Sequence, residues 1–407
     1  MKTQAKQMIP PSKQELSDRI ANLYSEMNKN QDSGWDFVFI TDKINQYYFT
    51  GTIQDGVFIL KSDGSYFYFV RRSIERAKSE CPFSDIIYPM VSYKDIANII
   101  SENNQKVCKI YIETEIMTYA AFERMRKYFE VSNIASADRI IQKIRAVKSP
   151  YELSCMEESG RQHKIMFEDI VPALLREGMS ETELTGQIYE KMVSLGYHGV
   201  TRFGKSQAEM IVGQSGFGEN SVYPTNFDGP GGMRGMCPAV PIIGDRNRLL
   251  KKGDLVFIDI GYGWNGYHSD RTQVYMFGAE PPDYISNYHR KCMKIQKEVA
   301  DSLKPGNIPS EIYNSATSKL DSEFLSGFMG IGNGRVKFLG HGVGLQVDEY
   351  PVIANKFDEP LLENMTIAIE PKRSIENFGI VGVEDTYVVT KNGGRCLTGG
   401  EKDIIVV

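Results

Sequence analysis

Apolar positions follow two different spacings along the first part of the chain. Residues 14–29 carry apolar side chains at helical spacing, which predicts an amphipathic helix. Residues 35–40 and 46–51 are short apolar and aromatic runs, and they predict strands. Two apolar runs within residues 57–70 flank Ser62-Asp63-Gly64, and an Asp-Gly pair in that setting is a strong hairpin signal. The sequence therefore predicts a small unit of mixed helices and strands, without a chemical motif.

A capped helix marks the start of a second region. Ser149 and Glu152 have the spacing of a capping box, and Pro150 between them suits the first helical position. A chain of 407 residues also exceeds what one hydrophobic core usually organises. We therefore expect an N-terminal domain of residues 1–147 and a C-terminal domain of residues 148–407.

The pattern in the second region predicts both strands and helices. Residues 254–259 and 272–276 read as partner strands, and residues 282–303 and 310–325 read as helices. Between them and the capped helix, residues 203–250 are rich in Gly and Pro. Loops of this length in a compact domain are usually functional or disordered. We expect this segment to form the wall or the entrance of a pocket.

Composition narrows the class of protein. The net charge of -5 gives no basic face for nucleic acid, so no nucleic-acid partner is expected. No apolar run approaches the length of a membrane span, and no membrane partner is expected. The six cysteines contain no C-x-x-C pair, which favours reduced thiols in a cytoplasmic protein over a disulfide framework.

Five polar residues lie in short, apolar, Gly-flanked segments of the second region: Asp259, Asp270, His341, Glu370 and Glu384. Burying a carboxylate in such a run is costly unless a partner offsets its lost hydration. Taken singly, each residue is more often a cap, a turn former or a strand end. Together, four carboxylates and one imidazole would satisfy two divalent metal ions, with Mn, Fe, Co or Zn best suited to this donor set. Two ions about 3.5–4 Å apart can generate and hold a hydroxide nucleophile.

These five segments, in this order, resemble the metal site of a known superfamily. It holds methionine aminopeptidase, aminopeptidase P, prolidase and creatinase, and its fold is called the pita-bread fold. The N-terminal region is similar to the accessory domain of the prolidase and creatinase types. The resemblance implies an α+β protein of two domains, an N-terminal creatinase/prolidase-like α/β domain and a C-terminal domain with a curved, mainly antiparallel sheet. It also implies a homodimer.

The resemblance assigns a role to each of the five residues. Asp259 and Asp270 would come from neighbouring strands, with Asp270 bridging both ions. His341 would bind one ion. Glu370 and Glu384 would close the site, and Glu384 would be the second bridge. Glu370 would also act as general base and then general acid while activated water attacks the carbonyl of a small amide or short peptide.

Three positions depart from the prolidase pattern. No histidine lies between His198 and His268, where the pattern places one. Asp348 stands where the pattern has a second histidine, and Gly382 stands where it has an arginine. The replaced groups serve the substrate carbonyl and its developing charge, and an aspartate cannot supply the electrostatics of an imidazole at neutral pH. We therefore expect weak or no cleavage of ordinary Xaa-Pro dipeptides.

Asp348 leaves alternatives open. It could be a catalytic base, it could favour a cationic substrate group, or it could cap a turn before Tyr350-Pro351. The segment 348–351 also resembles dimethylsulfoniopropionate lyases of this fold, although Gly261 stands where those enzymes have an aspartate. The alternative function is therefore a lyase, or another enzyme that cleaves a carbon–heteroatom bond of a small metabolite. A binding protein without chemistry is a third possibility, against which all five metal-binding residues argue.

The remaining histidines have weaker assignments. His198 could supply an imidazole to the site or could be an ordinary loop histidine. His268 lies two residues before Asp270 and could support the metal ligands. His163 and His289 fall in helical patterns and are expected to be surface or packing residues.

Overall fold

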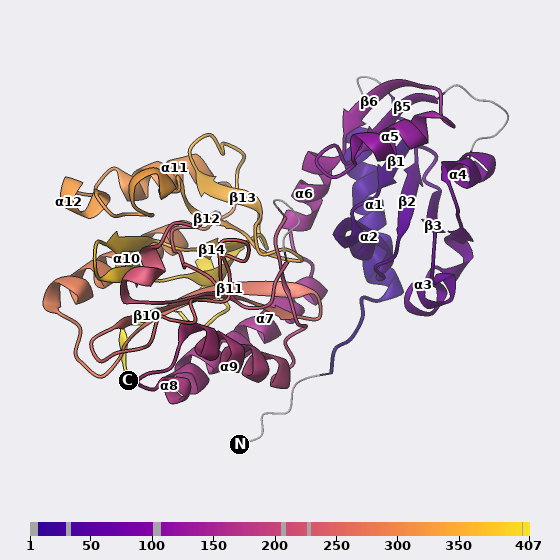
Figure 1. The fold of residues 1–407 in the computed structure, drawn as a ribbon. Helices are drawn as coiled ribbons and strands as arrows, with labels where there is room; N and C mark the ends of the chain where they lie inside the picture. Colours follow the sequence, from indigo (N-terminus) through magenta and orange to yellow (C-terminus); the bar gives the residue numbers. More distant parts are fainter. Residues whose placement is uncertain (1–6, 30–33, 101–106, 205–208, 226–228, 401) are drawn as a thin grey trace. The chain divides into compact units, whose positions relative to one another are not determined.

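The structure is a computed structural model that describes residues 7–29, 34–100, 107–204, 209–225, 229–400 and 402–407. The chain divides into two compact units, one of residues 9–145 and one built on residues 146–407 (Figure 1). Each unit combines helices with its own sheets, so the predicted two-domain α+β architecture is confirmed. Among the helices that the structure describes, none combines the length and the apolar character needed to cross a membrane.

The first unit is built on a six-stranded sheet in the order β4-β3-β2-β1-β5-β6. Its strands are β1 (Phe37–Ile40), β2 (Gly56–Lys61), β3 (Tyr66–Val70), β4 (Ile87–Pro89), β5 (Val107–Ile112) and β6 (Val131–Ser136). Its helices are α1 (Lys13–Lys29), α2 (Lys43–Thr50), α3 (Ile74–Glu80), α4 (Tyr93–Ile100), α5 (Tyr119–Arg126) and α6 (Asp138–Ala146). Strands β2 and β3 form the predicted antiparallel hairpin.

The prediction of a strand over residues 46–51 is wrong, because this segment belongs to helix α2. The Asp42 side chain caps the helix by accepting hydrogen bonds from the amides of Ile44 and Asn45. Gly51 ends it in the left-handed region, at φ 76°. The two caps outweigh the strand preference of the aromatic run between them.

The second unit holds two larger sheets, in the orders β19-β11-β10-β9 and β13-β12-β14-β17-β18, and the smaller pairs β15-β16 and β7-β8. Most neighbours are antiparallel, and β11 and β19 pair in parallel. The strands of the first sheet are β9 (Gly213–Phe217), β10 (Leu255–Trp264), β11 (Tyr267–Met276) and β19 (Ile405–Val406). Those of the second sheet are β12 (Phe338–Gly342), β13 (Glu349–Ala354), β14 (Thr366–Ile369), β17 (Asp385–Thr390) and β18 (Gly393–Cys396). The small pairs are β15 (Lys372–Ile375) with β16 (Gly379–Gly382), and β7 (Thr201–Arg202) with β8 (Glu209–Met210).

The helices of the second unit are α7 (Pro150–Ile165), α8 (Val171–Leu174), α9 (Glu181–Ser194), α10 (Asp283–Asp301), α11 (Pro309–Thr317) and α12 (Ser322–Leu325) (Figure 1). Of these, α7, α9, α10 and α11 pack against the sheets. Helix α7 begins with the predicted capping box and packs against β10 and β11, whereas α10 packs against β15 and β16. The single helix predicted over residues 310–325 is wrong, because Asp321 caps a separate helix by accepting a hydrogen bond from the Phe324 amide.

The Gly- and Pro-rich segment of residues 203–250 is partly sheet rather than loop. Within it, β9 pairs with β10 from Val256↔Phe217 to Ile260↔Gly213. Residues 205–208 and 226–228 of this segment lie outside the described residues. The pairing places β9 beside the strand that carries Asp259, whose cross-strand partner is Gln214.

Candidate metal centre

The structure brings the five predicted residues together from five segments of the second unit. Asp259 lies on β10, Asp270 on β11 and His341 on β12. Glu370 directly follows β14, and Glu384 directly precedes β17. A backbone bridge between Thr272 and Glu384 joins the strand of Asp270 to the residue that precedes β17, so residues distant in sequence meet on rigid elements.

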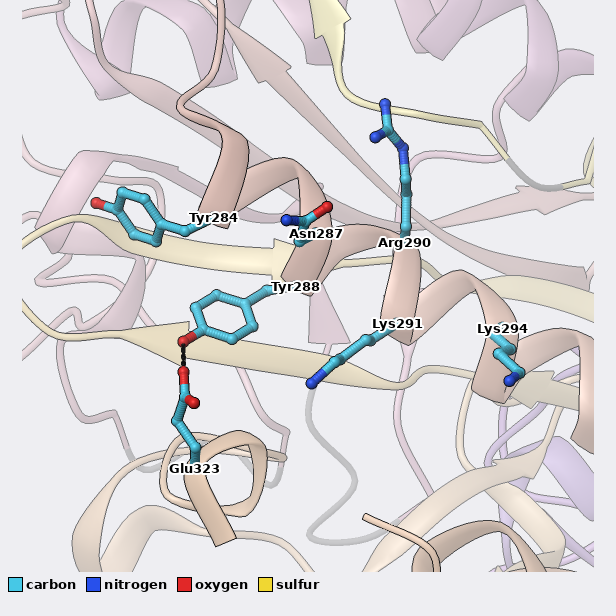
Figure 2. Close-up of a pocket in the computed structure, with 7 residues that line it drawn as sticks. All are labelled: Tyr284, Asn287, Tyr288, Arg290, Lys291, Lys294 and Glu323. Atoms are coloured by element: carbon cyan, nitrogen blue, oxygen red, sulfur yellow. Dashed lines mark hydrogen bonds between the residues drawn. The ribbon is translucent and has the colours of Figure 1, made fainter. Parts of the chain in front are cut away.

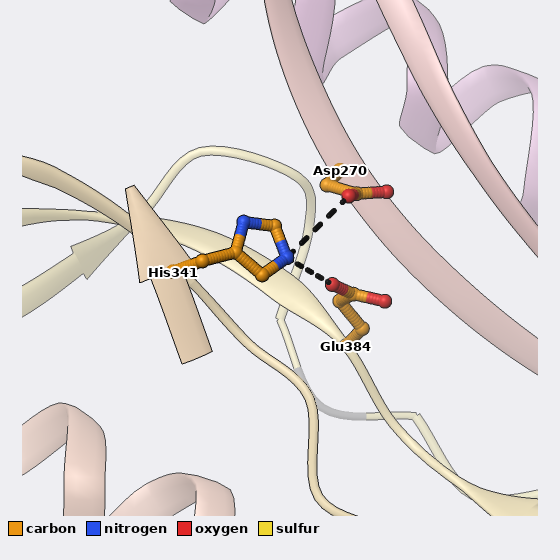
Figure 3. A group of neighbouring side chains, drawn as sticks. All are labelled: Asp270, His341 and Glu384. Atoms are coloured by element: carbon orange, nitrogen blue, oxygen red, sulfur yellow. Dashed lines mark ion pairs between the residues drawn. The ribbon is translucent and has the colours of Figure 1, made fainter. Parts of the chain in front are cut away.

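The five residues form two overlapping groups, each with ligand atoms within 4.8 Å of one another. Asp270, His341 and Glu384 make the first group (Figure 3). In it, the His341 Nε2 atom lies 3.9 Å from Asp270 Oδ2 and 3.7 Å from Glu384 Oε1. Asp259, Glu370 and Glu384 make the second group, and Glu370 Oε1 also lies 3.4 Å from His341 Nε2. Glu384 is the member that both groups share.

The two oxygens of Glu384 have different surroundings. Oε2 accepts hydrogen bonds from the Thr272 hydroxyl at 2.9 Å and from the Lys372 ammonium at 2.7 Å. Oε1 is buried and has no hydrogen-bond partner among the described residues. Buried polar atoms are nearly always satisfied, and an exception needs an explanation. The carboxylate is 1% exposed and turns its unpartnered oxygen toward His341, so the first group fits a divalent cation.

Lys372 is a member of the site that the sequence analysis missed. Its Nζ atom lies 2.8 Å from Asp259 Oδ2, 2.8 Å from Glu370 Oε2 and 2.7 Å from Glu384 Oε2, and its side chain is fully buried. The three carboxylates are the members of the second group, which therefore surrounds an ammonium. A signal was present in the sequence, because alternate residues of an extended segment face the same side and Lys372 lies two residues after Glu370.

Gly382 faces Lys372 across the β15–β16 pair, in direct register. Its φ is 143°, and a Cβ atom there would lie 2.5 Å from the Pro371 carbonyl oxygen and 2.6 Å from the Lys372 Cα. No side chain fits at such distances. The arginine of the prolidase pattern is therefore excluded here, and the positive charge comes from the opposite strand.

Burial and the repulsion between neighbouring carboxylates favour the binding of positive charge at this centre. Burial raises the pKa of Asp270 well above its usual value, and the charges of Glu384 and Asp259 raise it further. Burial opposes the charge on Lys372, but the surrounding carboxylates overcome it and hold the pKa well above its ordinary value. Burial likewise opposes protonation of His341, yet Glu370 and the other carboxylates raise its pKa to about 10. The site thus binds positive charge in preference to releasing it.

Asp348 lies outside both groups. It is half-buried, and its carboxylate accepts a hydrogen bond from the Gly204 amide. The preceding residue is also held, because the Val347 amide donates to the Arg202 carbonyl at 2.7 Å. These contacts join the segment to residues 202–204, and the catalytic, substrate-binding and turn-capping roles of Asp348 all stay predictions.

His198 and His268 are buried neighbours with ring centroids 4.9 Å apart. His198 Nδ1 accepts from the Gly266 amide and Nε2 donates to the Val200 carbonyl. His268 Nε2 accepts from the Arg202 amide and Nδ1 donates to the Gly344 carbonyl. Burial lowers the pKa of both rings, that of His268 to about 4. Both histidines are therefore neutral, with backbone partners at each ring nitrogen.

His163 and His289 are also fully buried, which settles them as packing rather than surface residues. His163 Nδ1 lies 3.2 Å from the Ser269 hydroxyl. His289 accepts from the Gly382 amide and donates to the Lys402 carbonyl. Neither belongs to the two candidate metal groups.

A hollow away from the acidic centre lies along α10 and offers different chemistry. Figure 2 shows its lining: Tyr284, Asn287, Tyr288, Arg290, Lys291, Lys294 and Glu323. The Tyr288 hydroxyl donates to the Glu323 carboxylate. This lining has no set of converging carboxylates and imidazole, so the acidic centre is the better candidate for the functional site.

Comparisons with known proteins agree with this geometry. Residues 154–391, more than half of the chain, match metallopeptidase family M24. The chain belongs to metallopeptidase family M24. Residues 19–147 match the creatinase/prolidase N-terminal domain, as M24 proteins of the prolidase type would. The predicted membership of the prolidase and creatinase superfamily is confirmed, and with it a metallohydrolase.

Relatives of this M24 chain align over nearly its whole length. The Xaa-Pro dipeptidase of Pyrococcus furiosus is 27% identical, and the alignment covers 96% of this chain and 100% of that protein. The prolidase structure from Pyrococcus horikoshii OT3 has a TM-score of 0.75 at 24% identity, covering 95% of this chain and 100% of that one. The dipeptidase PepE structure from Mycobacterium ulcerans has a TM-score of 0.77 at 22% identity, covering 97% and 98%. These two structures establish the shared fold.

Proposed function

We propose that this protein is a metal-dependent hydrolase that cleaves the amide bond of a small amide or short peptide. The observation that carries the proposal is the group of Asp270, His341 and Glu384, with a buried carboxylate oxygen of Glu384 that lacks a hydrogen bond. Membership of family M24 and the Xaa-Pro dipeptidase among its relatives support an amide substrate.

In this proposal Asp270, His341 and Glu384 hold a divalent ion, with Mn, Fe, Co or Zn suited to their oxygen and nitrogen donors. Asp259 and Glu370 complete the set predicted for two ions. A bound metal would polarise the substrate carbonyl and lower the pKa of water.

Glu370 is the proposed general base and acid. It is 4% exposed, and Lys372 donates a hydrogen bond to Oε2 at 2.8 Å while Oε1 faces His341. The lysine thus fixes the carboxylate and leaves Oε1 directed at the candidate ion site. Glu370 would take a proton from the attacking water and return it to the leaving amine.

In this proposal the protein cleaves simple Xaa-Pro dipeptides only weakly or not at all. Support comes from Gly382, where close backbone contacts exclude an arginine, and from His198, whose two ring nitrogens are occupied by backbone groups. A missing donor to a developing oxyanion costs roughly 10²–10³ in kcat. Asp348 gives the lyase alternative no particular support, because its carboxylate is hydrogen-bonded to the Gly204 amide.

The proposal further places the protein in the cytoplasm as a homodimer. Residues 148–407 would form the catalytic domain, and residues 1–147 would form the accessory domain. Light scattering would measure the mass of the assembly in solution, and small-angle X-ray scattering would measure its size.

A substrate panel with a matched variant tests the proposed function. Wild type and Glu370→Gln, each loaded with Mn²⁺, are assayed on Xaa-Pro dipeptides, other dipeptides, tripeptides and small amides in H₂¹⁸O. We expect wild type to incorporate one ¹⁸O into the product of at least one short peptide or amide, and the variant to lose this activity with its metal retained. Turnover without ¹⁸O would indicate a lyase, and rapid cleavage of Gly-Pro and Ala-Pro would contradict the proposed specificity.

A further inference from the structure

The ammonium group of Lys372 lies inside the second group of candidate metal ligands. Its three nearest carboxylate oxygens are Asp259 Oδ2, Glu370 Oε2 and Glu384 Oε2, at 2.8, 2.8 and 2.7 Å. These residues are the whole of that group. We propose that Lys372 takes the place of the second metal ion, so that the centre holds one divalent cation beside a built-in ammonium.

The two cations would compete for the same space. A Zn-like ion binds carboxylate oxygens at about 2.0–2.2 Å, so an ion held by these three oxygens would lie in the space that they enclose. Nζ already occupies that space at hydrogen-bonding distance from all three. An ion and an ammonium cannot both be there, because their atoms would overlap and their charges would repel each other.

The surroundings of Lys372 hold it in place. Its side chain is fully buried, and its Nζ lies 5.8 Å from the centroid of the Phe257 ring. Its backbone is fixed by pairing with Gly382 and by the carbonyl, which accepts a hydrogen bond from the Met329 amide at 2.8 Å. Hydrogen bonds between an ammonium and a carboxylate are among the stronger ones in proteins. Release of the lysine would require the loss of three of them at once.

The first group remains available to an ion. Glu384 divides its carboxylate between the two groups, with Oε2 bound to Lys372 and Oε1 left without a hydrogen bond among the described residues. Oε1 lies 3.7 Å from His341 Nε2, and Asp270 Oδ2 lies 3.9 Å from the same nitrogen. The lysine therefore satisfies one half of the centre and leaves the other half in need of a cation.

Metal stoichiometry tests the inference, which rests on the proposed metal centre but not on hydrolysis. Wild type, Lys372→Ala and Lys148→Ala are dialysed against excess Mn²⁺, and bound ions per folded chain are counted by elemental mass spectrometry. Lys148 is the matched control, because it is another buried lysine of the same unit and pairs with Glu349 at 3.2 Å. We expect one ion in wild type, two in Lys372→Ala and one in Lys148→Ala.

Electron paramagnetic resonance of the Mn²⁺-loaded wild type gives a second readout that needs no variant to fold. An isolated ion gives an uncoupled signal, which we expect, whereas a spin-coupled pair would overturn the inference. One ion in a folded Lys372→Ala would overturn it as well, since the lysine would then not be what excludes the second ion. Two ions in wild type would overturn this inference alone, and no ion in wild type would overturn the proposed metal centre together with it.

Discussion

Buried carboxylates are stabilised in two different ways in the two units of this protein. In the first unit, Glu113 is fully buried and accepts hydrogen bonds from the Thr41 and Asp42 amides, the Thr41 hydroxyl and the Asn45 side chain. In the second unit, Glu384 is equally buried, but its partners are the Thr272 hydroxyl and the Lys372 ammonium, and one oxygen has none among the described residues. A carboxylate surrounded by neutral donors needs no ion, whereas one with an unpartnered oxygen indicates a cation site.

The difference between Glu113 and Glu384 depends on their hydrogen-bond donors and not on the domain in which each lies. Glu181 lies in the second unit, like Glu384, yet its carboxylate accepts from the Phe217 and Asp245 amides and from the Asn220 side chain. It therefore resembles Glu113. Burial alone does not mark a functional carboxylate, because all three glutamates are buried.

The largest expected effect concerns the proposed base. Glu370→Gln should lower kcat by roughly 10²–10⁴, because an amide cannot accept the proton of the attacking water. Bound Mn²⁺ should remain, since the first metal group does not include this residue. Turnover and metal content are measured on the same preparation. Undiminished turnover would remove Glu370 from the mechanism.

Substitution of Glu113, whose hydrogen-bond donors are all neutral, should lower the stability of the protein and leave its metal content unchanged. Glu113→Ala leaves several buried donors without an acceptor, which we expect to cost about 3 kcal/mol of the free energy of unfolding. Urea unfolding measures this loss, and elemental analysis of the folded fraction should show unchanged metal. A change in metal stoichiometry would mean that the two kinds of site are coupled.

Metal removal should destabilise the protein only where the first group is intact. An ion at about 100 times its Kd stabilises the folded state by about 2.7 kcal/mol. Added Mn²⁺ should therefore raise the thermal midpoint of wild type, and a chelator should reverse this shift. Asp270→Asn should abolish most of the shift, because it removes a carboxylate charge from the group. A full shift in that variant would contradict a ligand role for Asp270.

The stability that Glu113 contributes should also depend on pH. Burial and the nearby charge of Asp42 raise the pKa of Glu113 from 4.5 to about 7, so the folded state holds a proton that the unfolded chain has lost between these values. The stability contributed by this group is present below pH 4.5 and is lost as pH rises toward 7. Glu113→Gln should flatten the pH dependence of unfolding over this range. An unchanged slope would show that Glu113 stays ionised.

The smallest effect is expected at Asp348. Asparagine keeps an oxygen that can accept from the Gly204 amide, so Asp348→Asn should change activity by less than tenfold and stability by about 1 kcal/mol or less. Loss of a catalytic base would instead cost about 10²–10⁴ in kcat. Kinetics on the best substrate of the panel separate the two roles of Asp348.

Much of the fold and the convergence of the five predicted metal-binding residues could be predicted from sequence, because strands, caps and unusual buried carboxylates leave local signals. The sixth predicted residue, Asp348, lies outside both groups. The five residues do converge in the structure. Residues 46–51 were predicted incorrectly because the deciding signal, the Asp42 cap, lies outside the aromatic run. The alternation of Glu370 and Lys372 was a local signal for a shared face, but Lys372 was missed because a lysine after a proline also resembles an exposed strand residue. Its burial depends on the long-range register with Gly382, which local pattern does not reveal.

The direct pairing of Lys372 with Gly382 also limits how this centre could be redesigned. An arginine introduced at position 382 would place its Cβ 2.6 Å from the Lys372 Cα and 2.5 Å from the Pro371 carbonyl oxygen, so the two strands would have to separate first. Removing Lys372 alone leaves the backbone contacts at Gly382 unchanged. Positions 372 and 382 are therefore structurally coupled. Moving the positive charge from one strand to the other requires a new strand spacing as well as a pair of substitutions.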